Sequence, residues 1–96
     1  MSEKSDAKAR KLDLRSAVLK ELSNYPPKHF KQVTLSILGL LRNATPHDSA
    51  TLTGHPHWRR IDVGEYRVIY HFDADTVHVS VVGKRNDAEV YRLLKR

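Results

Sequence analysis

Apolar residues early in the chain follow a helical spacing, with Val18, Leu19 and Leu22 on one face of the segment 17–23. Ser16 stands directly before this segment, where its hydroxyl can accept a hydrogen bond from one of the first free N–H groups of a helix. We therefore expect a short helix over residues 17–23 that is capped by Ser16.

A second helix is expected to begin at Pro27, because Tyr25-Pro26-Pro27 interrupts the first one and proline is tolerated in an opening helical turn. Gly39 weakens this helix, and Asn43 and Pro46 indicate its end. Its core-facing positions are three or four residues apart: Phe30, Val33, Thr34, Ile37, Leu38 and Leu41. The two segments predict a helical hairpin with one apolar stripe.

After Trp58 the apolar period changes from helical to two, which is typical of strands. The period predicts three antiparallel strands, at residues 58–63, 66–72 and 77–84. Gly64-Glu65 supplies a two-residue turn with glycine first, the signature of a type II′ hairpin. The polar segment 44–57 before the strands is expected to be a long loop anchored by Leu52, and such loops are candidate contact surfaces.

The two-residue turn determines which residues of the hairpin lie opposite one another and share a face. One face is expected to join the core: Ile61, Val63, Tyr66, Val68 and Tyr70. The other face carries Trp58, Arg60, Asp62, Arg67, Ile69 and His71. A four-residue turn at 73–76 keeps the next strand in register and adds Val77, Val79 and Val81 to the core face. The same register places Lys84 on the polar face.

At the two ends of the chain the patterns are weaker. Asn86, followed three residues later by Glu89, resembles a capping box and predicts a short last helix through Leu94. Residues 11–14 alternate polar and apolar side chains, as in a short strand or the approach to a helix. The charged residues 1–10 are expected to be loosely ordered.

These elements predict an α+β fold in a single domain, residues 11–96. Its helical hairpin packs on a small antiparallel β-sheet, and a short helix follows at the C-terminal end.

The composition and charge of the chain limit the classes of function that we expect. The formal charge is 17 − 11 = +6, and a pI near 9.8 suggests a polyanionic partner, although a basic surface can also serve solubility alone. The absence of cysteine excludes disulfides, zinc ribbons and thiol nucleophiles. No apolar run approaches the ~20 residues of a membrane span, and the charged start does not resemble a signal peptide. We expect a soluble cytoplasmic protein without a membrane partner.

The polar strand face and the last helix are expected to bring five side chains together: Arg60, Arg67, Lys84, Arg85 and Tyr91. Arginines offer paired N–H donors to phosphate, and nearby cations favour the ionised form of a phenol. This set suits metal-independent cleavage of a phosphodiester. A structural explanation is also open, because Asp62 faces Arg67 as a cross-strand ion pair and Tyr91 can pack within its helix.

The histidines suggest weaker alternatives. His55 and His57 lie in the expected loop without a nearby pair of carboxylates, so we predict no metal site there. His71 and His78 are expected to lie opposite each other on the polar face, as proton shuttles or as ordinary surface residues. We predict no cofactor.

The segment 52–70, with its G-x-Y-R-x-I-Y hairpin, resembles the RelE/ParE family of toxins, and the resemblance extends over nearly the whole chain. The ending Gly83-Lys84-Arg85 with Glu89-Val90-Tyr91 is similar to the RelE branch, whose members cut messenger RNA in the ribosomal A site. The resemblance therefore implies a ribosome-dependent endoribonuclease, the toxin of a type II toxin–antitoxin system.

The resemblance also implies roles for individual residues. Arg67 matches the arginine that stabilises the transition-state phosphate, and Arg85 matches one that assists phosphate or leaving-group chemistry. Tyr91 matches the proposed base for the 2′-hydroxyl, and Arg60 keeps the charge of a catalytic-face lysine. The implied RNA-binding residues are Lys84, Arg59, Trp58 and Arg92. Two positions depart from the pattern, because Trp58 and Asp62 replace basic residues; Trp58 can stack on a base instead.

The implied partners are a cognate antitoxin, mRNA and the ribosome, with operator DNA contacted only through the antitoxin. Two alternatives remain open at this point. One is a ParE-type inhibitor of DNA gyrase that is not an enzyme, and the other is a decayed toxin that only binds its antitoxin.

Overall fold

The computed structural model describes residues 9–85. The predicted capping box, the last helix, Tyr91 and Arg92 lie outside the described residues, as do residues 1–8 of the N-terminal extension. Among residues 9–85, neither helix is long and apolar enough to cross a membrane.

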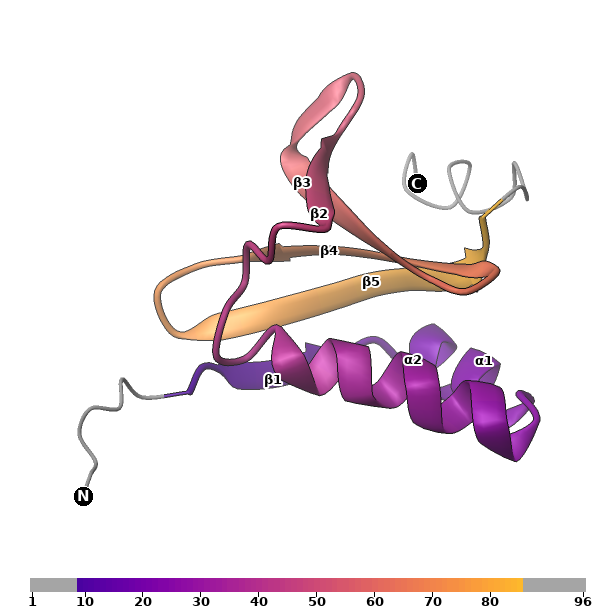
Figure 1. Cartoon of the computed structure of the whole chain (residues 1–96). Coiled ribbons are helices and arrows are strands. Elements are labelled where there is room, and N and C mark those ends of the chain that lie inside the picture. Colours follow the sequence, from indigo (N-terminus) through magenta and orange to yellow (C-terminus); the bar gives the residue numbers. More distant parts are fainter. Residues whose placement is uncertain (1–8, 86–96) are drawn as a thin grey trace.

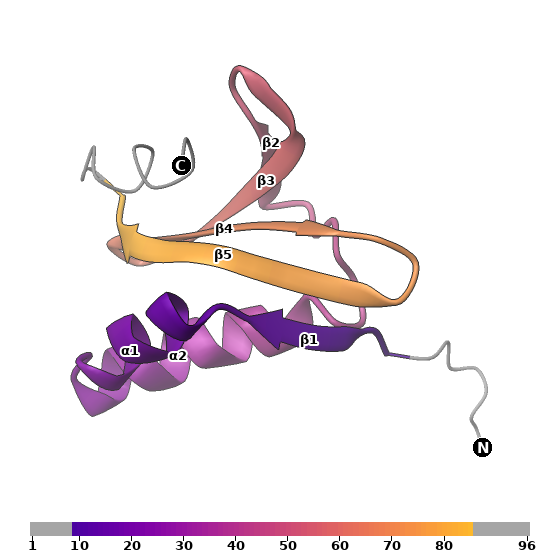
Figure 2. The same ribbon diagram turned by 180° about the vertical axis from the view of Figure 1, so that it is seen from behind.

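Two helices pack on one face of a five-stranded sheet, in the strand order β1-β5-β4-β3-β2 (Figures 1 and 2). The elements are β1 (Lys11–Leu14), α1 (Ser16–Ser23), α2 (Pro27–Gly39), β2 (Ser49–Leu52), β3 (His55–Val63), β4 (Tyr66–Phe72) and β5 (Thr76–Lys84). The sheet is antiparallel except at one edge, where β1 runs parallel to β5. The expected α+β fold, a helical hairpin on a small sheet, is confirmed.

The first helix begins one residue earlier than predicted, so Ser16 is not its cap. Arg15 is the last extended residue after β1, with φ −64° and ψ 150°, and makes no side-chain capping bond. Its carbonyl accepts the N–H groups of Val18 and Leu19 at 2.9 and 3.2 Å. Val18 is buried as expected, whereas Leu19 is 55% exposed because only a narrow side of α1 meets the sheet.

The second helix begins at Pro27 as predicted and buries Val33 and Ile37. Its buried stripe is narrower than expected, since Phe30 and Leu38 remain 43% and 44% exposed. Leu40, just beyond the helix, is buried in their place. The helical hairpin therefore keeps an apolar side that the described residues do not cover.

The segment predicted as a long loop contains a strand. Residues of β2 pair antiparallel with β3, which begins at His55 and not at Trp58. Gly54 turns the chain between them with φ +79°, a conformation that favours glycine. The sequence hides β2 because it is a short edge strand with a bulge after Thr51 and mostly polar side chains. Leu52 is buried, as its expected anchoring role requires.

The hairpin of β3 and β4 has the predicted register, with Asp62 opposite Arg67 and Val63 opposite Tyr66. Gly64 adopts φ +59° at the turn. Tyr66, Val68 and Tyr70 face the helices and belong to the main core. The sequence therefore predicted correctly which side chains of this hairpin face the helices.

A β-bulge in β5 changes the faces of its last residues. Tyr70 pairs with Val79 but Ile69 pairs with Val81, so Ser80 is an extra residue in the strand. Val81 therefore joins the face away from the helices, contrary to the prediction, and Val82 enters the main core. Beyond the bulge, Lys84 lies opposite Tyr66 and not beside Arg67 as predicted.

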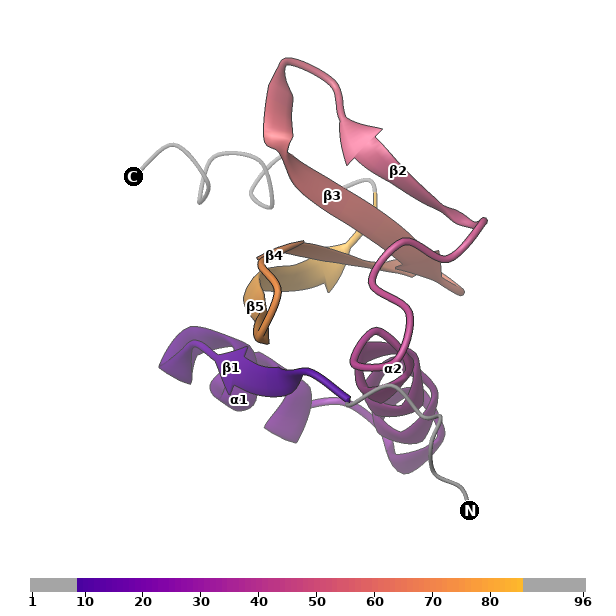
Figure 3. The same cartoon turned by 90° about the vertical axis from the view of Figure 1, so that its left-hand side faces the viewer.

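The face of the sheet turned away from α1 and α2, here called the outer face, has a small apolar cluster of its own. Leu52, Ile69 and Val81 are buried there, and Trp58 packs against them. Figure 3 shows β2 and β3 rising from the sheet on the side opposite the helices. The outer face is therefore partly apolar, although we expected it to be polar and solvent-exposed.

Candidate functional site

Three arginines converge on one carboxylate at the end of the outer face where β3 turns into β4. Arg67 donates from Nε to Asp62 Oδ1 at 2.6 Å and from Nη2 to Oδ2 at 3.1 Å. Arg60 donates from Nη1 to the same Oδ2 at 3.1 Å. Arg85 brings Nε to 3.7 Å from Oδ2. We call these four residues the arginine cluster.

The local fold explains why these residues meet. Asp62 and Arg67 lie opposite each other because the turn at Gly64 contains two residues. Arg60 lies two residues before Asp62 in β3 and thus projects from the same face. Arg85 follows β5 and is held by its own backbone, whose N–H donates to Glu65 O at 2.9 Å. Its Nη1 also donates to Gly64 O at 3.1 Å.

The cluster is partly shielded from water at its centre and open at its rim. The side chain of Arg67 is 15% exposed and that of Asp62 25%, whereas Arg60 and Arg85 are 32% and 47% exposed. The hydrogen bond from Arg67 lowers the pKa of Asp62 more than burial raises it, and the charges of Arg60 and Arg85 add to the lowering. The carboxylate is therefore ionised at neutral pH, and the cluster has a formal charge of 3 − 1 = +2.

This arrangement can bind a phosphate group. The guanidinium of Arg67 makes two parallel hydrogen bonds to the carboxylate, which is the geometry that arginine also uses with phosphate oxygens. Three guanidinium groups around one point can stabilise charge that develops on a phosphate during reaction. The sequence predicted the pair of Asp62 and Arg67 and the convergence of the three arginines, but not that Arg60 and Arg85 approach the carboxylate of Asp62.

The described tyrosines lie elsewhere. Tyr25 and Tyr66 stack on the helix side of the sheet with ring centroids 4.3 Å apart, and burial raises the pKa of Tyr25. Tyr70 is buried in the main core, where its hydroxyl donates to Ala44 O at 2.7 Å. Within residues 9–85, therefore, no tyrosine adjoins the arginine cluster on the outer face.

The predicted RNA-binding residues do not all share the face of the arginine cluster. Arg59 pairs with Tyr70 on the helix side, and its Nη2 donates to Ser49 Oγ at 2.8 Å. Lys84 is opposite Tyr66, also on the helix side. Trp58 lies on the outer face with Arg60, beside the small apolar cluster. The structure thus brings Trp58 to the same face as the arginines and separates Arg59 and Lys84 from it.

A row of rings lies at the other end of the outer face. His71 and His78 pair as predicted, with stacked rings 4.7 Å apart, and Trp58 meets His71 edge to face at 4.6 Å. Burial lowers the pKa of His71, and the neighbouring histidines lower it further. A hydrogen bond to Asp13 raises the pKa of His78. The sequence did not predict Asp13 as a partner, because it lies in the parallel strand β1.

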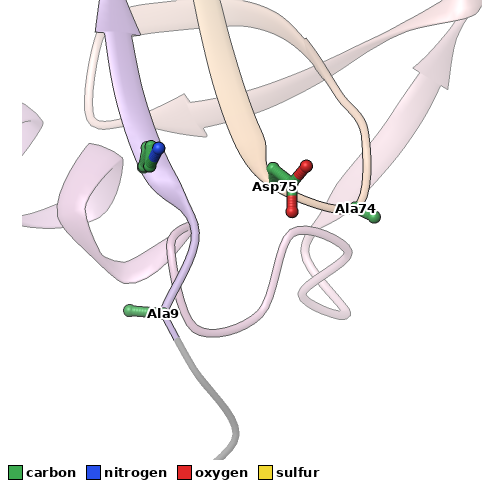
Figure 4. Close-up of a pocket in the computed structure, with 4 residues that line it drawn as sticks. Ala9, Ala74 and Asp75 are labelled. Carbon is green, nitrogen blue, oxygen red and sulfur yellow. The ribbon is translucent and has the colours of Figure 1, made fainter.

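Two further observations concern ligands. Among residues 9–85 there is no group of three or more His, Asp or Glu side chains arranged for a metal ion. An open hollow of about 460 Å³ lies between β1 and the turn from β4 to β5, lined by Ala9, Lys11, Ala74 and Asp75 (Figure 4). It has only one acidic and one basic side chain and is separate from the arginine cluster.

Comparison with known proteins shows which solved structures share this fold. No protein-family model matches the chain, and no curated protein matches it in sequence. A mutant of the E. coli toxin RelE, solved in the free state, is 26% identical, with a TM-score of 0.75 over 92% of this chain and 97% of that one.

Two solved complexes also share the fold. The toxin–antitoxin complex RelBE2 of Mycobacterium tuberculosis matches at 21% identity and a TM-score of 0.70, covering 85% of this chain and 98% of that one. The RelE–RelB complex of Pyrococcus horikoshii matches at 22% identity and a TM-score of 0.70, covering 83% of this chain and 99% of that one.

The two helices, the five-stranded sheet and the near-complete coverage show that this chain has the fold of the RelE toxins of toxin–antitoxin systems. The 26% identity to the E. coli toxin RelE supports the resemblance to the RelE toxins that the sequence indicated.

Proposed function

We propose that this chain is a metal-independent endoribonuclease that cleaves mRNA in the ribosomal A site. The observation that supports the proposal best is the convergence of Arg60, Arg67 and Arg85 around a single carboxylate at the outer face. The same three residues are those to which the RelE resemblance gives catalytic roles. The net positive charge of the whole chain, +6, is suited to an RNA substrate.

In the proposed reaction the 2′-hydroxyl of the substrate attacks the adjacent phosphorus. The new O–P bond forms as the bond to the 5′-oxygen of the next nucleotide breaks, which leaves a 2′,3′-cyclic phosphate. Tyr91 acts as the base or orienting group for the 2′-hydroxyl, and the leaving oxygen takes up a proton. Arg67 and Arg60 stabilise the charge on the phosphate oxygens, and Arg85 assists at the phosphate or the leaving oxygen.

The proposed partners are a cognate antitoxin, mRNA and the ribosome, all met in the cytoplasm, with operator DNA contacted only through the antitoxin. Of the solved structures with this fold, one is the toxin–antitoxin complex RelBE2 and another is a RelE–RelB complex. Large apolar side chains are exposed on the two helices and would suit such a protein partner: Leu19, Phe30, Leu35 and Leu38.

The proposal is tested by expressing the toxin and mapping the 5′ ends of translated mRNA by primer extension. We expect cuts within codons for the wild type and a loss of roughly 10²–10³ in cleavage for Arg85→Ala, because one transition-state contact is removed. Tyr91→Phe should also abolish cleavage. Arg42→Ala is the matched control, since Arg42 is exposed beyond the end of α2, and it should cleave normally.

One observation favours the alternative of a ParE-type gyrase inhibitor. Asp62 accepts hydrogen bonds from Arg67 and Arg60, and it stands at a position where the RelE pattern has a basic residue. In that case growth arrest would come with DNA damage and intact transcripts, and Tyr91→Phe would be nearly silent. Full toxicity in both Arg85→Ala and Tyr91→Phe would exclude the catalytic roles. A decayed toxin would bind its antitoxin and leave growth and transcripts unchanged.

A further inference from the structure

The acidic residue at the centre of the arginine cluster uses the donors that a phosphate would need. Arg67 binds both carboxylate oxygens of Asp62, and Arg60 shares the second of them. A phosphodiester offers the same pair of partly charged oxygens to the fork of an arginine. A phosphate that reaches Arg67 must therefore displace Asp62 or share its donors.

We propose that Asp62 is an intramolecular competitor of the RNA phosphate and sets the affinity of the site for its substrate. The inference rests on the proposed function, because it takes the phosphate of RNA as the ligand. It goes further by assigning a role to a residue of this chain that departs from the RelE pattern. Asp62 is a residue that limits affinity, and it does not take part in the reaction.

The geometry indicates the order in which a phosphate would gain the donors. Arg85 is the most exposed of the three arginines, and its Nε lies 3.7 Å from Asp62, beyond hydrogen-bond distance. Arg60 is held by a single bond at 3.1 Å, and Arg67 by two. An incoming phosphate can thus bind Arg85 and Arg60 at the rim first. The donors that Arg67 gives to Asp62 become available to a phosphate only if the carboxylate turns away.

A different role for Asp62 would give the opposite result. If the carboxylate served to hold the three guanidinium groups in place for the substrate, its removal would leave them poorly ordered and weaken binding. Arg85 has anchors of its own, since its backbone and side chain bind Glu65 O and Gly64 O. At least this arginine therefore keeps its place when Asp62 is neutralised. The sign of the change in affinity separates the two roles.

The test measures binding of a short fluorescein-labelled single-stranded RNA with 2′-O-methyl riboses, which cannot be cleaved by its 2′-oxygen. We expect Asp62→Asn to bind it about tenfold more tightly than wild type, a change of about 1.4 kcal/mol. The logarithm of affinity should also fall more steeply with salt, by roughly 0.7 for each additional phosphate that the freed arginines neutralise. Asp62→Ser is a second variant that gives the same readout if Asn disturbs folding.

Asp48→Asn is the matched control, because it makes the same change of net charge in the exposed segment before β2. It should leave affinity and salt dependence close to those of the wild type. Equal or weaker binding by both Asp62 variants, or an equal gain in Asp48→Asn, would overturn the proposal.

Primer extension on the same variants distinguishes this inference from the proposed function. Tighter binding without cleavage by any variant would support the role of Asp62 and refute the ribonuclease. Cleavage by the wild type, together with unchanged RNA binding in Asp62→Asn, would support the ribonuclease and refute the role of Asp62.

Discussion

Replacement of Asp62 by asparagine should destabilise the fold, by an amount that depends on pH in a definite way. The side chain is 25% exposed and binds Arg67 and Arg60. Exposed ion pairs contribute about 0.2–1 kcal/mol, whereas breaking a buried pair costs about 3–5 kcal/mol. The partly shielded position of Asp62 points between these limits, to a loss of about 1–2 kcal/mol at pH 7. For a domain of this size, each kcal/mol lowers Tm by about 4–8 °C.

The sign of the pH dependence follows from the direction of the shift. The arginines lower the pKa of Asp62 below its unfolded value, which is about 3.9. The stability that the carboxylate provides is therefore complete well above that unfolded pKa. It is lost as the pH falls through about 4 toward the lower pKa of the folded state. The asparagine of the variant cannot titrate, so the difference between the two proteins should shrink in acid.

Urea unfolding followed by circular dichroism, at pH 7 and again near pH 3, measures this difference directly. The m value should be the same for both proteins, so that the shift in midpoint reports stability alone. Asp48→Asn again controls for the change in net charge. If Asp62→Asn is as stable as wild type at pH 7, or if its deficit is equal at both pH values, the ion pairs of Asp62 do not stabilise the fold.

Two further predictions concern groups away from the arginines. Tyr70→Phe removes the buried hydroxyl that donates to Ala44 O and should lower the free energy of unfolding by about 1–3 kcal/mol, measured by urea unfolding; an unchanged midpoint would show that the bond contributes nothing. The raised pKa of His78 should appear in an NMR titration and fall in Asp13→Asn, because Asp13 is its strongest partner. Its stabilising effect is complete below about pH 6.5 and is lost as the pH rises through the folded pKa; equal titration curves in the two proteins would contradict the contact.

The register of the central hairpin was predictable because a single local feature determines it. The two-residue turn at Gly64 and Glu65 determines which residues pair. The pairing of Asp62 with Arg67 could therefore be predicted from the sequence alone. The convergence of Arg85 with Arg60 and Arg67 was expected as well, but its approach to Asp62 was not. Arg85 reaches the cluster through backbone contacts with the turn, and no pattern along the chain encodes that contact.

The errors in the prediction have equally local causes. Strand β2 was missed because an edge strand of four residues, paired by its backbone, needs no apolar alternation. Lys84 was assigned to the wrong face because the extra residue, Ser80, has no signature in a run of β-branched side chains. Leu19 was expected in the core because helical spacing shows which residues share a face, but not how wide the buried contact is.

The bulge at Ser80 also determines which residue of β5 lies opposite Arg67. Because β5 carries one extra residue, the position opposite Arg67 is Gly83, which has no side chain to crowd or repel the guanidinium. If Ser80 paired regularly and the strand had no bulge, the residue opposite Arg67 would be Val82, whose branched side chain would lie beside the guanidinium. The presence or absence of the bulge in β5 can thus change the side chain beside the guanidinium of Arg67 while every residue of the arginine cluster stays the same. In this fold, a bulge in one strand is thus a means by which evolution can change the surroundings of the proposed phosphate-binding residues.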